Sequence, residues 1–411
     1  MEKPEIRFKG YTDEWEQRKL SELSDFITKG ATPTTYGYDW QESGIPFFRN
    51  DAIKDNQFIY GDFSYISEEA NEALQRSEIH GDDILVAITG DIGKAGIVPK
   101  SIEKGNINQH TARVRIVKDA IPYFVYQSLI TDEQQKKYQL IKTGLSMPQL
   151  SLQQIRDTIV LCPSVEEQSM IGECFINLDN LITLHQRKCD EVKTLKKYML
   201  QKMFPQNEQK VPEIRFEGFT EAWEQRKLED YLEVSSEKNR DELLGKEDVL
   251  SVSGEVGIVN QIEFQGRSFA GVSVANYGIV EVGDVVYTKS PLKSNPYGII
   301  KTNKGKTGIV STLYAVYKPK KNVDSEFVQI YFESDFRMNS YMHPLVNKGA
   351  KNDMKVSDAN ALKGPVFFPK IEEQIVISQY FNSLDHLITL HQQKCEELKK
   401  IKKFMLQKMF V

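Results

Sequence analysis

At 411 residues the chain is too long to fold around one ordinary core, so two or three domains are expected. Its composition, 40% hydrophobic and 27% charged, is that of a globular protein, and it lacks the apolar run of about twenty residues that a membrane span needs. The net charge of -5 argues weakly against a nucleic-acid partner, although the charge of one region can differ from the total.

Cysteine usage and the first residues bear on the compartment. The four cysteines include no CxxC pair, and "MEKPEIRFKG" has no apolar core of the kind found in secretory signals. Both features favour a reduced, cytoplasmic protein over a secreted disulfide scaffold.

The first segment of the chain is repeated about half a chain later. "PEIRFKGYTDEWEQRKL" starts at Pro4, and "PEIRFEGFTEAWEQRKL" starts at Pro212. We assign a leading repeat to residues 1–20, and a linker with the second leading repeat to residues 205–228. Trp15 and Trp223, at the start of "WEQRKL", are predicted to pack the junction between a common scaffold and the block that follows.

Two blocks, residues 21–164 and 229–370, follow the leading repeats. They share little sequence beyond fragments such as "GDDILV" and "GDVVY". Short apolar runs such as "ILVAIT", "TARVRIV", "VVYTK" and "TLYAVYK" predict strands. One helical stretch is expected in each, from Pro122 and from Ser325. Each block is therefore predicted to be a mixed α/β domain.

A longer repeat ends each half, at residues 165–204 and 371–411. The copies are identical at 25 of 40 positions, and apolar residues recur at alternating steps of four and three. This heptad rhythm predicts two long helices that form an antiparallel coiled coil. Further apolar positions exceed what one seam uses, which indicates either a docking face for partners or burial against the domains: Leu181, Leu184, Leu195, Leu387, Leu390 and Ile401.

Two histidine–cysteine pairs interrupt the apolar seams. His185 and Cys189 lie four residues apart, as do His391 and Cys395. Four such ligands could hold zinc if the helices met in register. The favoured interpretation is a small polar break that fixes the register of the two helices.

The sequence carries no convincing catalytic or cofactor motif. "TGDIGKAG" has the wrong spacing for a phosphate-binding loop and is interpreted as a turn between strands. We predict no catalytic residue, no metal ligand and no bound cofactor in this chain. A self-contained methyltransferase is disfavoured for the same reason.

A local signal for DNA lies in the second block. Residues 285–323 contain eight lysines and no acidic residue, which suits phosphate contacts. "NKGAKNDMK" repeats this chemistry from Asn347. The candidate DNA-binding residues of this block are Lys289, Lys293, Ser294, Asn295, Lys348, Lys351 and Asn352.

The first block carries a weaker signal of the same kind. "FFRND" and "NQHTAR" hold arginine, asparagine and glutamine, the side chains that pair with guanine and adenine edges. "KTGLSMPQLS" is a polar loop before the long helix. The candidate DNA-binding residues here are Arg49, Asn50, Lys94, Asn108, Gln109, Lys142, Ser146 and Gln149.

This pattern resembles the specificity subunit of type I restriction-modification systems over essentially the whole chain. The resemblance rests on the paired "WEQRKL" segments, the paired "LITLHQ" and "LQKMF" helices, and the run "GLSMPQLSLQQIRDTIVLCPSVEEQ". The second copy of that run is one residue longer and differs in sequence. The fold class it implies is α+β: two pseudo-symmetric mixed α/β target-recognition domains separated by two long antiparallel coiled-coil helices.

The resemblance also implies a non-catalytic function. Each recognition domain would read one half of a split target in double-stranded DNA, and the differing blocks would make that target asymmetric. The helices would set the spacer and seat two modification subunits. S-adenosylmethionine, ATP and Mg would be bound by those subunits and by restriction subunits, and no membrane would be involved. The alternative is a non-DNA coiled-coil adaptor with two ligand-binding lobes.

Overall fold

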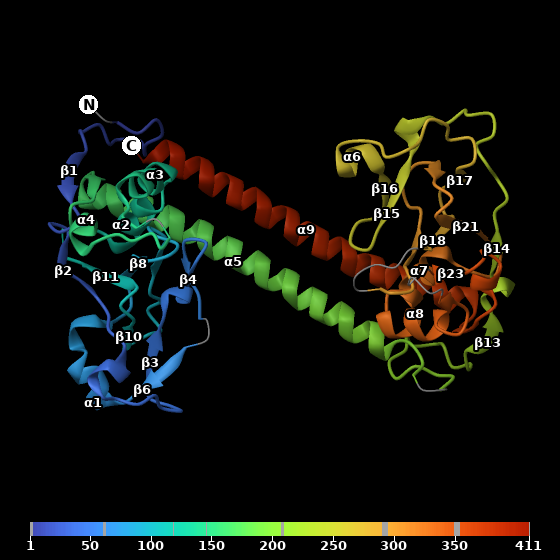
Figure 1. Cartoon of the computed structure of the whole chain (residues 1–411), viewed down its shortest axis with the longest axis horizontal. Coiled ribbons are helices and arrows are strands. Elements are labelled where there is room, and N and C mark those ends of the chain that lie inside the picture. The colour runs from blue at the N-terminus through green and yellow to red at the C-terminus, as the bar shows by residue number, and fades with distance from the viewer. Residues whose placement is uncertain are drawn as a thin grey trace. The chain divides into compact units, whose positions relative to one another are not determined.

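The computed structural model describes residues 3–60, 63–117, 119–144, 146–206, 209–289, 295–348 and 354–410, without the side chains of 347, 348, 354 and 355. The chain divides into two compact units (Figure 1). Unit 1 comprises residues 1–186 and 392–411, and unit 2 comprises residues 187–391. The division falls within the two long helices, so each helix contributes to both units.

Unit 1 is a two-sheet domain with helices on its outer faces. Its strands are β1 (Glu16–Lys19), β2 (Ser24–Lys29), β3 (Ile45–Phe48), β4 (Ile53–Lys54), β5 (Gln57–Phe58), β6 (Ser64–Ile66), β7 (Glu78–Ile79), β8 (Ile84–Ala87), β9 (Ala95–Ile97), β10 (Gly105–Ile107), β11 (Thr111–Ile116) and β12 (Ile159–Cys162). Its helices are α1 (Glu68–Ala73), α2 (Pro122–Leu129), α3 (Asp132–Ile141), α4 (Leu152–Arg156), the first part of α5 (Val165–Lys202) and the last part of α9 (Ile371–Met409).

The sheets of unit 1 have the strand orders β2-β11-β8-β9 and β6-β3-β10-β7. Side chains of β8 alternate between two cores: Ile84 and Val86 pack beneath the helices, while Leu85 and Ala87 face the second sheet. This burial on both faces explains why "ILVA" is continuously apolar. In Figure 1, α2, α3 and α4 gather near the chain termini, and β3, β6 and α1 lie at the opposite end of the unit.

Unit 2 repeats this architecture although its sequence differs. Its strands are β13 (Glu224–Lys227), β14 (Leu232–Val234), β15 (Leu250–Ser253), β16 (Gly257–Asn260), β17 (Gly278–Val280), β18 (Val285–Thr288), β19 (Ile300–Thr302), β20 (Gly308–Val310), β21 (Tyr314–Pro319), β22 (Asn347–Lys348), β23 (Met354–Lys355) and β24 (Pro365–Phe368). Its own helices are α6 (Gln261–Gln265), α7 (Ser325–Phe332) and α8 (Asp335–Met342).

The strand order β14-β21-β18-β19 matches that of the first sheet of unit 1. The pairs β17-β20 and β15-β16 take the places of β7-β10 and β3-β6, and the parallel bridge from Val249 to Ile309 matches the parallel pairing of β3 with β10. The two blocks therefore share a fold as well as scattered fragments. The predicted α+β class, with two mixed domains and two long antiparallel helices, is confirmed.

The "EQRK" segment, directly after each tryptophan, forms a strand that closes each block. β1 pairs antiparallel with β12, so Glu16 faces Cys162, and β13 pairs with β24 in the same way. Trp15 is buried and its ring lies 6.3 Å from that of Phe410, while Trp223 is buried 5.8 Å from Phe204. The predicted packing of the junction by the two tryptophans is confirmed.

Each predicted helical stretch in the blocks is two helices. Thr131 interrupts the first, because its hydroxyl accepts a hydrogen bond from the amide of Gln134 and caps α3. Ser334 caps α8 in the same way through the amide of Arg337. A hydroxyl that caps a helix start competes with continuation of the preceding helix, so α2 and α7 end after two turns.

The long helices run antiparallel in each unit. In unit 1, Lys402 of α9 donates to Asp179 of α5 at 2.7 Å, and in unit 2 Lys196 of α5 donates to Asp385 of α9 at the same distance. These four residues occupy matching positions of the long repeat. The same acid–lysine pair therefore fixes the helix register in both units. Within the described part of the chain, no helix is long and apolar enough to cross a membrane.

A buried ion pair joins each leading repeat to the start of a long helix. Arg7 contacts Glu167 at 2.7 Å, with 13% and 0% of the two side chains exposed. Arg215 contacts Glu373 at 2.6 Å, with 12% and 2% exposed. Each pair has two nitrogen–oxygen contacts, which holds the guanidinium and the carboxylate in one plane.

We predict that Arg7→Met destabilises unit 1 by about 3 kcal/mol, because it leaves the Glu167 carboxylate buried without a counterion. Hydrogen exchange of the β1 and β12 amides measures this loss. Arg18→Met is the control, since Arg18 and Glu22 form an exposed pair that contributes under about 1 kcal/mol. Equal effects of the two variants would contradict the prediction. The double variant Arg7→Met/Glu167→Leu should recover part of the loss.

Candidate nucleic-acid interface

Three loops of unit 1 meet at one edge of its sheets. Asn50 follows β3, and its side-chain amide donates to the carbonyl of Thr89 in the loop after β8 at 3.0 Å. The amide of Gly90 donates to the carbonyl of Pro148 at 3.0 Å, and Thr89 forms a bridge with Gln149. Loops distant in sequence are thereby joined through backbone and amide groups.

The turn after β10 joins the same edge. The amide of Asn108 donates to the carbonyl of Phe48 at 3.2 Å, and that of Ile88 donates to the carbonyl of His110 at 3.0 Å. The side-chain oxygen of Asn108 accepts from the amide of His110, which tightens the turn. We name residues 49–50, 89–94, 108–110 and 142–149 the unit 1 loop cluster; residue 145 is outside the described part of the chain.

The cluster includes every candidate DNA-binding residue of the first block. Arg49 is exposed, donates to Ser64 at 3.1 Å and lies 5.5 Å from the ring of Trp40. Lys142, Ser146 and Gln149 are exposed, and Lys94 is half-buried. The side-chain oxygen of Asn50 is buried without a hydrogen-bond partner among the described residues. Planar amides and a guanidinium therefore share one edge with polar loop backbone.

A further loop, residues 30–40, packs against the unit 1 loop cluster and was not among the sequence candidates. Thr32 donates to the side-chain oxygen of Gln109 at 2.7 Å. A Cβ at Gly30 would lie 1.7 Å from the carbonyl oxygen of Ile107, so only glycine allows this approach. The loop carries Tyr36, which is 61% exposed, and Trp40. The aromatic and glycine residues in "TPTTYGYDW" were the signal that could have identified it.

The candidates of unit 2 are less completely described. Lys289 pairs with Asp358 at 2.9 Å, and the amide of Asn295 donates to Asp335 at 2.6 Å. Lys348 lies in β22, which pairs with β23 where unit 1 has the 142–149 loop, and its side chain is outside the described part. The predictions outside the described residues are Lys293, Ser294, Lys351 and Asn352.

The lysine run of residues 285–323 is not an uncompensated basic stripe. Folding brings carboxylates from other segments to four of its eight lysines: Lys289 to Asp358, Lys301 to Glu333, Lys304 to Glu326 and Lys318 to Asp284. At these four positions the lysines are paired with acids that lie far away in sequence, which the local composition does not reveal.

Lys318 shows that this neutralisation is structural. It lies 3.1 Å from Asp284, 2.6 Å from Glu281 and 3.4 Å from Glu237. Burial lowers the pKa of Lys318, but these carboxylates outweigh that effect and raise it overall. Arg115 and Asp83 form the matching pair in unit 1 at 2.7 Å. Both pairs hold the "GD" turn against the sheet.

The long helices carry apolar side chains outside the seam. Leu181, Leu195, Leu387, Leu390 and Ile401 are 39–49% exposed, while Leu184 is half-buried. Tyr198 and Phe404, which sequence reasoning missed, are 48% and 50% exposed.

These residues fall into two patches, one in each unit. They precede the seam positions of their helices by one residue, which places them on one face of an antiparallel pair. The unit 1 patch is Leu181, Leu184, Ile401 and Phe404. The unit 2 patch is Leu195, Tyr198, Leu387 and Leu390.

The cysteines of the seam contact backbone carbonyls. Cys395 lies 4.0 Å from the carbonyl of Ile182 in unit 1, and Cys189 lies 3.9 Å from that of Ile388 in unit 2. Among the described residues, no group of three or more histidine, cysteine, aspartate or glutamate side chains is placed to hold a metal ion. The geometry favours a role in helix register.

Comparison with known proteins finds similarity to one family over part of the chain and to its members over most of it. Residues 12–194 match the family model described as type I restriction modification DNA specificity domain. The putative type I restriction enzyme MjaX specificity subunit of Methanocaldococcus jannaschii is 23% identical, over 95% of this chain and 91% of that protein. The EcoBI specificity subunit of Escherichia coli is 29% identical over 39% of this chain and 34% of that protein. The fold is similar to the crystal structure of the S subunit of a type I restriction-modification system from M. genitalium, with a TM-score of 0.62, 14% identity and coverage of 100% of this chain and 99% of that one.

The structural role of the lysine run predicts a difference between two of its members. Lys318→Met should destabilise unit 2 by about 2 kcal/mol, since Asp284 keeps only 4% of its side chain exposed and would lose its counterion. Lys306→Met, at an exposed position of the same run, should change stability by less than about 0.5 kcal/mol. Urea unfolding measures both, and a loss at Lys306 equal to that at Lys318 would refute the distinction.

Proposed function

We propose that this chain is a specificity subunit of a type I restriction-modification system. It reads a bipartite DNA sequence, with one unit on each half. The observation that carries this proposal is the repetition of one two-sheet domain with different loop residues. A shared fold presents its loops to DNA in the same way, and different side chains on those loops select different bases. The target is therefore asymmetric.

In unit 1, the loop cluster supplies the base-reading groups. Arg49 and Gln109 are the strongest candidates, because their planar groups are held in place by neighbours: Arg49 by Ser64, and Gln109 by Thr32 and His110. Arginine pairs with guanine and glutamine with adenine through two hydrogen bonds each. Preorganised side chains lose less conformational entropy when they bind.

The helices set the distance between the half-sites in this proposal. α5 contains 38 residues and α9 contains 39, which correspond to about 57 Å of helix each. A stiff helix pair holds a spacing that a flexible linker would not maintain. Inserted length in the helices therefore changes the spacer and not the bases read.

The chain itself is non-catalytic in this proposal. Two modification subunits bring S-adenosylmethionine and methylate adenine, and restriction subunits bring ATP and Mg. The two apolar patches seat the modification subunits, one on each unit, because exposed leucine, isoleucine and aromatic side chains on one face suit burial against a partner helix. The other interpretation was burial of these side chains against the recognition domain of the same unit, but that domain leaves them exposed.

Single substitutions test the division of reading. We expect Arg49→Ala and Gln109→Ala to relax recognition of the same half of the target, by about 1–3 kcal/mol each. Asn295→Ala in unit 2 should affect only the other half. Mapping of methylated adenines in cells that contain each variant and the modification subunit measures both effects. A substitution in unit 1 that alters both halves would contradict the assignment.

A matched pair of variants tests the docking patches. Leu181→Asp should weaken binding of the modification subunit at least tenfold, because it places a charge in an apolar interface. Thr183→Asp adds the same charge about 200° around the same helix, away from the patch, and should bind normally. Analytical ultracentrifugation with the purified modification subunit gives the affinities. Equal losses for both variants would show that the charge, and not the patch, is responsible.

A further inference from the structure

Unit 2 holds a buried guanidinium at the end of a long helix. Arg337 of α8 lies 4.2 Å from the ring centre of Phe204 and 5.3 Å from that of Tyr331. It donates to the carbonyls of Tyr331 at 2.7 Å and of Leu200, in the last turn of α5, at 2.9 Å. Only 9% of the residue is exposed. The last-turn carbonyl of α5 and two aromatic faces thus surround this cation. Burial lowers the pKa of Arg337, and Tyr331 and Glu333 partly oppose that effect.

The matching place in unit 1 has no such group. Counting from the caps Thr131 and Ser334, Gln134 of α3 stands where Arg337 stands in α8. Counting back from the same caps, Ser128 stands where unit 2 has Tyr331. Phe410 takes the place of Phe204 and stacks on Phe124, as Phe204 stacks on Phe327. Unit 1 therefore keeps the ring at the helix end and lacks the guanidinium and tyrosine that cover it.

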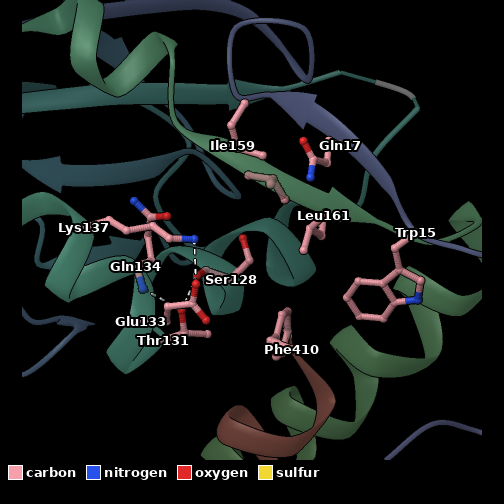
Figure 2. Close-up of a pocket in the computed structure, with 11 residues that line it drawn as sticks. Trp15, Gln17, Ser128, Thr131, Glu133, Gln134, Lys137, Ile159, Leu161 and Phe410 are labelled. Carbon is pink, nitrogen blue, oxygen red and sulfur yellow. Dashed lines mark hydrogen bonds and ion pairs between the residues drawn. The ribbon is translucent and has the colours of Figure 1, made fainter. Parts of the chain in front are cut away.

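A cavity of about 230 Å³ occupies this place in unit 1. Figure 2 shows Phe410 and Ser128 near its centre, with Trp15 on one side and Gln134 and Lys137 on the other. Trp15 and Gln134 are buried, while Gln17, Glu133, Lys137 and Ile159 are exposed. The cavity is therefore open to a group that enters from the surface.

A second depression continues from the cavity along α3. It shares Gln134, Lys137 and Ile159 with the first and extends to Ile141 and the start of α4, with a volume of about 670 Å³. Ile141 is 43% exposed, Ile159 is 44% exposed, and the neighbouring Leu140 is 85% exposed. The surface beside the cavity suits apolar residues that flank an inserted side chain.

We propose that this cavity receives the guanidinium of an arginine side chain from a polypeptide partner. The partner's arginine takes the place that Arg337 fills in unit 2. The Phe410 ring, at the end of α9, lines this place and attracts a cation, as the Phe204 ring does for Arg337. Glu133 also lines the mouth, where it pairs with Lys137 at 2.7 Å. A planar guanidinium stacks on a ring better than the ammonium of lysine, so the site distinguishes the two.

Fluorine NMR of the full chain labelled with 5-fluorotryptophan tests the site, because the three tryptophans occupy different places. Trp15 lines the cavity, Trp223 lies in the filled counterpart, and Trp40 lies beneath Arg49. We expect capped arginine amide, titrated into the millimolar range, to shift the Trp15 resonance alone. Capped lysine amide should shift it at least tenfold more weakly. No shift at Trp15, or the same shift with both probes, would overturn the proposal.

Variants that exchange these residues between the two units provide the control. Ser128→Tyr/Gln134→Arg fills the cavity from within and should raise the apparent Kd for capped arginine amide at least tenfold. Tyr331→Ser/Arg337→Gln opens the counterpart and should make the Trp223 resonance respond to the probe. Folding is checked from the dispersion of the same spectra. If the filled variant binds as the original chain does, the probe sits elsewhere and the assignment is wrong.

A peptide arm tests the source of the arginine. A capped Leu-Arg-Leu tripeptide reaches the second depression as well as the cavity, so it should bind at least tenfold more tightly than capped arginine amide. Equal affinities would show that the cavity takes a free guanidinium compound and would overturn the assignment to a polypeptide.

Discussion

Each unit completes its core with an aromatic residue at the end of a helix that begins in the other unit. Phe204, after α5, is fully buried against Trp223, Phe327 and Phe381 in unit 2. Phe410, after α9, packs on Trp15, Phe124 and Phe175 in unit 1. A helix that stopped early would leave one core without its central ring, at a cost of about 3–5 kcal/mol. This requirement explains why both helices are long and nearly equal in length.

The same constraint separates what the sequence must keep from what it is free to change. The leading repeats and the helices supply the rings, the buried Arg–Glu pairs and the Asp–Lys pairs, all of which need particular residues at particular positions. The sheets need side chains that can be buried on both faces, a condition that "ILVA" and "VVYT" both satisfy. Loops at the sheet edge are constrained still less. Two domains with one fold and different loop surfaces follow from these unequal demands.

The sequence predicts the parts that depend on local pattern. The heptad rhythm predicts α5 and α9, and short β-branched runs predict β8, β11, β18 and β21. What it misses depends on contacts between distant residues. Glu237 neutralises Lys318 from 81 positions away, which composition along the chain does not reveal. The meeting of Asn50 with Thr89 is likewise a property of the folded sheets.

The two units differ where the domain meets the helix pair, although the Asp–Lys pair between the helices is the same in both. Asp179 in unit 1 accepts from Tyr123 and Gln127 of the domain as well as from Lys402, and burial beside this carboxylate raises the pKa of Tyr123. In unit 2 the domain approaches the matching pair through Glu333, which contacts Lys196 at 2.8 Å. Burial alone would raise the pKa of Glu333, but Lys196 and Lys301 lower it overall. One domain thus attaches by neutral donors to the acid, and the other by an acid to the lysine. The Asp–Lys pair fixes the helix register in the same way in both units. The unit 1 domain attaches through the aspartate of its pair, and the unit 2 domain attaches through the lysine of its pair.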